Sequence, residues 1–190
     1  MRWNLESEKL SEYFLMPYIM QEQRRLLEED LTCLVNEICD TYHTERFHLL
    51  AYKYICLKLG TKVLPQRRYA ALSALRAVYS DASFEWQRRL KVKPEKFINV
   101  DADFPALDEK IKKLSEKIMN IASQGEPYSA WQGLFNYSIT FLGRRILNEH
   151  KNEGFASLIT GVLEYLHDHF YEAEMAVYEN EQINRNGDIF

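Results

Sequence analysis

The sequence predicts an all-α protein, and three observations support that prediction. Seven Gly and five Pro in 190 residues are too few for the frequent turns of a sheet protein. Apolar residues recur at steps of three and four in several stretches, which is the spacing of one helix face. The stretch from Pro127 to Gly143 has no charged residue, so a helix there must be surrounded by other helices.

The N-terminal half is expected to form four helices. Residues 5–16 form the first, which ends before Pro17. A longer helix follows over residues 19–42, and a third over residues 45–59 stops at Gly60, a residue suited to a left-handed cap. The fourth opens at Pro65 and runs to about Leu90.

Residues 1–44 are therefore expected to be an N-terminal helical extension, and residues 45–190 the main helical domain. Nothing in composition separates the two, so they are expected to form one compact unit.

An irregular stretch is expected at residues 91–104, where Pro94 and Asn99 favour turns. An amphipathic surface helix follows at residues 105–122, with its apolar residues on one face and most of its lysines on the other.

Two apolar helices, at residues 129–147 and from Gly154 onward, are expected to form a hairpin at the centre of the bundle. The polar residues 148–153 mark the turn between them. Amphipathic helices would wrap this central apolar helical hairpin. The tail from Tyr178 onward is polar and is expected to be frayed.

Composition argues against several functional classes. A formal charge of −4 and a pI near 5.8 argue against nucleic acid as a partner. No run of 18 apolar residues predicts a membrane span, and the polar first residues do not resemble a signal peptide. Three cysteines without a C-x-x-C pair predict free thiols in a cytoplasmic protein. We expect no metal and no cofactor.

The sequence lacks the usual enzyme signatures, and we expect a protein that is not an enzyme. One alternative is open. Arg145 and His150 have the R-x4-H spacing and resemble the catalytic motif of HEPN ribonucleases or toxins. His150 would move a proton and Arg145 would stabilise the transition-state charge. The simpler interpretation makes both residues the polar end of a buried helix.

The order of helices supplies a resemblance. Residues 45–59 and 72–81 precede Trp131, at the start of the apolar helix, and Glu164-Tyr165-Leu166 lies in the return helix. This series resembles the Bcl-2 family of apoptosis regulators, including divergent viral members of the gammaherpesvirus type. The resemblance covers residues 45–175 and implies a Bcl-2-like bundle.

The sequence departs from the family pattern at several positions. Gln132 and Gly133 follow Trp131 where the family has Gly and Arg. Asp81 lies one residue after the position at which the family has its aspartate. The family's Gly-Gly-Trp motif is missing after Met175. The missing arginine normally pairs with an aspartate of the bound helix. Arg88, Arg89 and Arg144 are candidates to replace its charge.

The resemblance implies an anti-apoptotic protein that binds amphipathic helices of pro-apoptotic proteins in a hydrophobic groove. It implies a cytoplasmic location, at mitochondrial or other membranes if a C-terminal tail follows this sequence. Alternatives are a protein-interaction scaffold without groove binding and a homodimer. The residues expected to line or support the groove are Leu75, Val78, Tyr79, Leu114, Ile118, Trp131 and Phe135.

Overall fold

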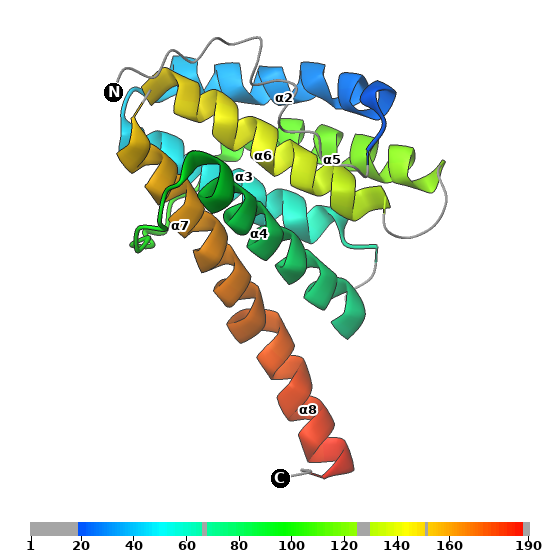
Figure 1. Ribbon diagram of the computed structural model, residues 1–190. Helices are drawn as coiled ribbons and strands as arrows, with labels where there is room; N and C mark the ends of the chain where they lie inside the picture. The colour runs from blue at the N-terminus through cyan, green and yellow to red at the C-terminus, as the bar shows by residue number, and fades with distance from the viewer. Residues whose placement is uncertain (1–18, 66–67, 125–129, 151, 188–190) are drawn as a thin grey trace.

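The computed structural model describes residues 19–65, 68–124, 130–150 and 152–187. Those residues form helices and connecting loops, which confirms the predicted all-α bundle (Figure 1). The helix expected at residues 5–16 lies outside the described residues. The elements are α2 (Gln21–Thr41), α3 (Glu45–Val63), α4 (Tyr69–Leu90), the 3₁₀ turn η1 (Pro105–Leu107), α5 (Asp108–Ser123), α6 (Ala130–His150), α7 (Glu153–Phe170), the π-helical turn η2 (Tyr171–Met175) and α8 (Ala176–Asn186).

Helix α3 lies in the interior of the bundle. Twelve of its 19 residues are buried, more than one helical face can supply. It packs against α5, α6 and α7, and the Tyr52 hydroxyl donates to the Ile139 carbonyl of α6 at 3.1 Å. The sequence indicated α6 as the central helix. The structure places both α3 and α6 in the core.

Gly60 does not end α3, contrary to the prediction, because the helix continues to Val63. Gly60 instead serves the packing between helices. A Cβ atom at Gly60 would overlap the Tyr79 hydroxyl and come within 3.3 Å of Leu75 Cδ1. Glycine therefore leaves room beside α3 for the Tyr79 and Leu75 side chains of α4.

The two apolar helices α6 and α7 are both largely buried, but they do not lie side by side along their length. They meet near their connection and diverge, with α6 packed most extensively on α2 and α7 on α4 (Figure 1). The predicted hairpin is thus a connection between two helices whose main partners are elsewhere.

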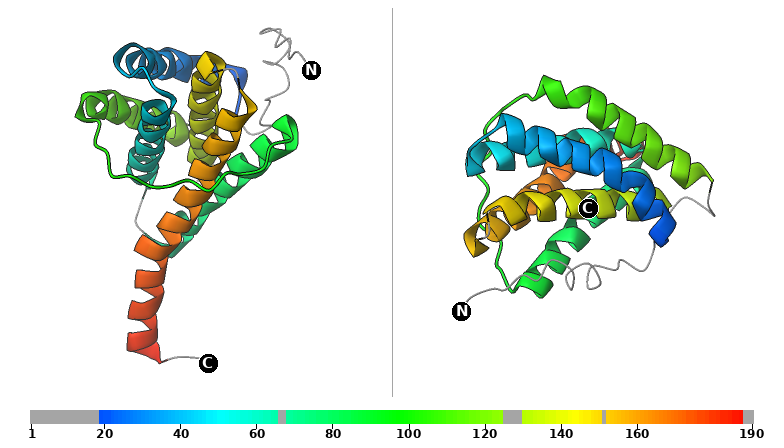
Figure 2. Two further views of the ribbon diagram at one scale, coloured as in Figure 1. Left: turned by 90° about the vertical axis from the view of Figure 1, so that its left-hand side faces the viewer. Right: turned by 90° about the horizontal axis from the view of Figure 1, so that it is seen from above.

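Residues 91–104, hereafter the strap, form the predicted irregular stretch and cross α7 (Figure 2). The Glu95 amide donates to the Ser157 carbonyl at 3.1 Å. A Cβ atom at Gly161 would overlap the Glu95 carbonyl, so glycine is needed where the strap crosses. The Lys53 ammonium donates to Asn99 Oδ1 at 2.7 Å and fixes the strap to α3.

Helix α2 belongs to the same bundle as the rest. It packs on α6 and α5, and its buried Asp30 pairs with Lys117 at 2.6 Å and Lys113 at 2.8 Å on α5. The part of the N-terminal extension that the structure describes therefore shares one core with the main domain.

The C-terminal tail is a helix rather than a frayed end. α7, η2 and α8 run on as one long rod, and α8 extends beyond the other helices (Figures 1 and 2). None of the α8 residues is buried. Within the described residues, no helix is long and apolar enough to span a membrane.

Candidate functional site

The seven residues expected at a peptide groove are core residues in this structure. Their exposed fractions lie between 0 and 5 %, so none presents an apolar surface to a partner. Helix α6 packs against both α4 and α5, and α3 packs on α5, so these residues face neighbouring helices. In this structure none of these seven residues lines an open groove, and a part for them in helix binding stays a prediction: Leu75, Val78, Tyr79, Leu114, Ile118, Trp131 and Phe135.

Tyr79 shows why these residues pack inward. Its ring meets Phe135 of α6 edge-on at 5.5 Å between centroids and stacks on Phe170 of α7 at 5.7 Å. Its hydroxyl donates to the Cys56 carbonyl of α3 at 2.8 Å. Burial raises the pKa of Tyr79 well above its ordinary value. One side chain thus joins four helices.

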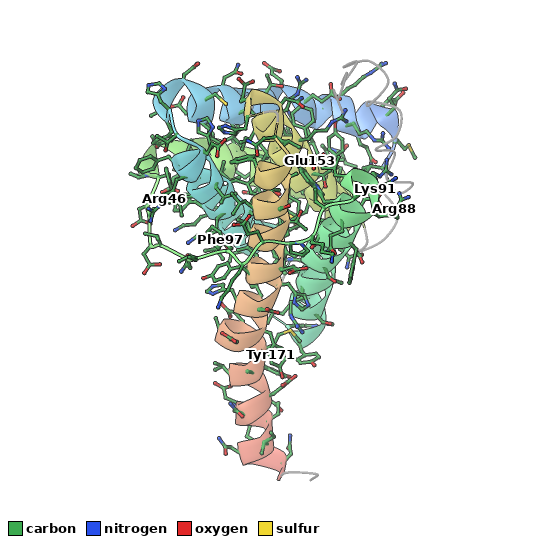
Figure 3. The ribbon with its side chains drawn as sticks, turned by 60° about the vertical axis from the view of Figure 1, so that its left-hand side comes forward. Arg46, Arg88, Lys91, Phe97, Glu153 and Tyr171 are labelled. Carbon is green, nitrogen blue, oxygen red and sulfur yellow. The ribbon has the colours of Figure 1, made fainter. Side chains whose placement is uncertain are left out.

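The predicted charge partners lie elsewhere, in a basic cluster formed by Arg88, Arg89, Lys91, Arg144 and Arg145. Arg88 and Arg89 share Glu85, and the Arg88 hydrogen bond is the main cause that lowers the pKa of Glu85. The pKa of Arg144 is lowered by burial and by the positive charges of Arg145 and Arg89. Figure 3 shows Arg88 and Lys91 pointing outward at the C-terminal end of α4.

Arg145 and His150, the alternative catalytic pair, contact different groups. The Arg145 guanidinium lies 5.1 Å from the centre of the Phe141 ring. His150 Nε2 lies 2.8 Å from His48 Nδ1, and the His150 ring lies 4.1 Å from that of Phe155. The structure therefore does not assemble the R-x4-H pair into one site. Among the described residues, no group of three or more His, Cys, Asp or Glu could hold a metal ion.

The two histidines form a hydrogen-bond chain with defined donors. His48 Nε2 contacts the Tyr42 carbonyl oxygen, which can only accept, so this nitrogen carries the proton. In a neutral ring His48 Nδ1 must then accept from His150 Nε2. This leaves a lone pair on His150 Nδ1, which faces Glu45 Oε1 at 3.6 Å. These hydrogen bonds connect the end of α2 with α3 and α6.

The histidine pair is expected to make the free energy of unfolding depend on pH. Burial, followed by the charge of His48, lowers the pKa of His150, while Glu45 and Glu149 oppose the shift. The unfolded chain then binds more protons below the ordinary pKa of about 6.5. We expect the free energy of unfolding to be fully retained above that pH. It should fall below that pH, by at most about 1.4 kcal/mol per pH unit for one proton.

Urea unfolding between about pH 5 and pH 8 measures this dependence. His150→Gln should flatten the profile below about pH 6.5, whereas the exposed His43→Gln should leave it as in the parent protein. An identical slope in the parent protein and His150→Gln would contradict the assignment.

Tyr69, Tyr171 and Tyr178 form an exposed aromatic surface, hereafter the tyrosine patch. Their exposed fractions are 41, 39 and 39 %. Tyr69 and Tyr171 donate to the two carboxylate oxygens of Glu179, at 2.9 and 3.3 Å, and the rings of Tyr69 and Tyr178 lie 5.8 Å apart. The hydrogen bond to Glu179 raises the pKa of Tyr69. Local sequence patterns do not predict this patch, because Tyr69 and Tyr178 lie 109 positions apart.

The fold and these surfaces define an all-α bundle with exposed aromatic and basic surfaces. Residues 97–189, which include the second half of the strap and helices α5 to α8, match a family model described as a domain of unknown function (DUF6899). Residues 1–96 lie outside the match. No curated protein and no solved structure matches the chain.

Proposed function

We propose that this protein is a protein-interaction module without catalytic activity, and that it binds another protein through the tyrosine patch. One observation carries the proposal. Three tyrosines, each about two-fifths exposed, gather at the base of a helix that has no buried residue. This is the scaffold alternative drawn from the sequence, with a surface now assigned to it.

Both the tyrosine patch and α8 would be stabilised by a bound partner. Tyrosine offers a large rigid ring with a polar end and few rotamers to immobilise, so it is enriched at protein interfaces. The 11 residues of α8 continue the α7–η2 rod without any buried residue, so tertiary packing contributes little to their helical stability. Val177 and Ile183 add exposed apolar area at 51 and 41 %. A partner covering this end would stabilise both features.

Site-specific photocrosslinking tests the proposal. A benzophenone amino acid replaces Tyr69, Tyr171 or Tyr178 in turn, or, as the control, the exposed Asn36 on α2, in cells that express the full chain. We expect ultraviolet light to join a protein to the chain at position 178 and not at position 36. Absence of any protein adduct at positions 69, 171 and 178 would contradict an interaction through this patch.

We further propose that the protein regulates apoptosis and that its partners are amphipathic helices of pro-apoptotic proteins. Support comes from the helix order and from the residues that resemble the Bcl-2 family. Because the seven groove residues are core residues, such a helix would bind at the tyrosine patch or displace α4. The proposal includes a cytoplasmic location, which the three free cysteines support.

Fluorescence anisotropy with a panel of pro-apoptotic helix peptides tests the apoptosis proposal. Micromolar or tighter binding that Tyr178→Ala weakens would support it. The absence of binding to every peptide would remove this partner class and leave the interaction module in place.

A further inference from the structure

One arginine of α4 holds the rod formed by α7, η2 and α8 at its π-helical turn. The Arg76 guanidinium donates from Nε to the His167 carbonyl at 3.2 Å and from Nη1 to Met175 Sδ at 3.8 Å. The same group lies 4.6 Å from the centre of the Tyr171 ring, and Figure 3 places Tyr171 beside the N-terminal end of α4. Arg76 therefore contacts the rod before the turn, at its first residue and at its last.

The π-helical turn η2 is the point at which the rod can bend. Such turns interrupt the regular hydrogen bonding of an α-helix, and helices commonly bend at them. Beyond η2, α8 has no buried residue, and it reaches α4 through contacts of Tyr69 with Glu179 and Tyr178. The direction of α8 therefore depends on a few surface contacts, and those of Arg76 lie at the bend itself.

A further contact of Arg76 depends on the protonation of His167. Arg76 Nη2 lies 3.1 Å from His167 Nε2. Guanidinium nitrogens only donate, so His167 Nε2 must carry a lone pair. A neutral His167 then has its proton on Nδ1, which donates to Asp168 Oδ1 at 2.9 Å. Arg76, His167 and Asp168 form a chain in which each donor meets an acceptor.

A protonated His167 cannot keep this arrangement. A proton on Nε2 would point an N–H group at the guanidinium N–H and would place two positive charges about 3 Å apart. The hydrogen bond from Arg76 is then lost, whereas the bond to Asp168 is kept and stabilises the charged ring. Proton uptake therefore favours separation of His167 from Arg76.

The other charges around His167 do not replace Arg76. The charged and titratable groups on the elements packed there are Arg68, Arg76, Glu164, Asp168, His169, Tyr171, Glu172 and Glu174. Glu164, one turn before His167, accepts from Ser83 and Gln87 of α4. Arg68 is the N-cap of α4 and lies about 12 Å from Arg76 along that helix. Arg76 is the cation in contact with His167, so the effect of protonation is concentrated there.

We propose that Arg76 and His167 form a pH-sensitive pin that fixes the direction of α8, and that protonation of His167 releases it. Histidine is the side chain that ordinarily changes charge between about pH 5 and pH 8. Because the pinned arrangement needs the neutral ring, each further pH unit on the acid side of this titration should change the ratio of released to pinned molecules by up to about tenfold. The pin acts on the rod whether or not the tyrosine patch binds a partner.

Pulsed electron paramagnetic resonance of the full chain measures the direction of α8. Spin labels on the exposed native Cys33 of α2 and on Asn184→Cys of α8 report the distance between bundle and rod, and Cys39→Ser removes the other thiol that is not buried. We expect one narrow distance distribution at about pH 7.5 and a second, broader population at about pH 5.5. An identical distribution at both pH values would overturn the inference.

Substitutions in the labelled protein assign the response. His167→Gln keeps an amide oxygen that accepts from Arg76 but takes up no proton, so its distribution should stay narrow at both pH values. Arg76→Gln should give the broad distribution at both. His169→Gln is the matched control, because His169 stacks on Tyr165 two residues along the same helix, and it should respond as the parent does. A full pH response in His167→Gln, or its loss in His169→Gln, would contradict the pin.

The second histidine pair requires its own control. His48 and His150 also respond to pH, so circular dichroism should show the same helix content at about pH 7.5 and about pH 5.5. The labelled His150→Gln variant should keep the response of the rod. Loss of that response in His150→Gln would assign the effect to the bundle and overturn the inference.

The tautomer of His167 tests the pin without any change at Arg76. NMR of the protein with isotope-labelled histidine nitrogens distinguishes a protonated ring nitrogen from one with a lone pair, and the His167 signals are those missing in His167→Gln. At about pH 7.5 we expect the proton on Nδ1 and the lone pair on Nε2. A proton on Nε2 at that pH would exclude the hydrogen bond from Arg76 and overturn the inference.

Discussion

Phe135→Ala is expected to lower the free energy of unfolding by about 3–5 kcal/mol. Phe135 is fully buried and meets Tyr79 edge-on at the junction of α6 with α4. Removing the ring leaves a cavity between helices that other contacts hold in place, so the site cannot collapse without cost. Urea unfolding followed by circular dichroism at 222 nm measures the change.

Phe84→Ala is the matched control, because Phe84 is 65 % exposed on α4 and its truncation should change stability by no more than about 0.5 kcal/mol. The comparison separates a core residue from a groove residue. If Phe135 instead faced an open groove, the alanine variant would remain nearly as stable as the parent. That result would restore the groove prediction and contradict the packing described for Tyr79.

Gly161→Ala should lower the free energy of unfolding by about 2 kcal/mol. In an open helix this change would add up to about 1 kcal/mol of helix propensity. Here the new Cβ atom would overlap the Glu95 carbonyl, so the strap would have to move away from α7. That movement strains the Glu95–Ser157 hydrogen bond and the Asn99 contact with Lys53. Hydrogen exchange should therefore also rise at the Glu95 amide.

Gly154→Ala in the same helix is its control, since the nearest atom to a Cβ there is Asn152 Oδ1 at 3.4 Å, an ordinary contact. Its stability should stay within about 0.5 kcal/mol of the parent. Equal effects of the two substitutions would show that the strap does not need glycine at its crossing point.

Most of the helices could be predicted from local patterns. Apolar spacing predicted α2, α5 and α6 within a few residues of their observed bounds, because one buried face imposes the period of the helix on the sequence. Pro94 and Asn99 likewise predicted the irregular strap. The end of α8 was predicted wrongly, since its polar composition reflects exposure and not the loss of helix.

The candidate site depended on contacts that local patterns do not contain. Tyr79 and Phe135 lie on apolar stripes that would look the same beside an open groove or inside a core. The tyrosine patch joins α4 to η2 and α8 through Glu179, and the His48–His150 pair joins residues 102 positions apart. The R-x4-H spacing gives only the separation of Arg145 and His150 along the sequence. In the structure, Arg145 contacts Phe141 and His150 contacts His48.

By itself, the sequence determined the all-α class, the apolar helices and the strap. Helix formation depends on hydrogen bonds within a segment and on the period of its buried face, and both are properties of neighbouring residues. The tertiary structure decided which helices pair, why Gly60 and Gly161 must lack a side chain, and which tyrosines meet at Glu179. Those features depend on close packing between distant segments, where the free space around each atom is set by the whole bundle.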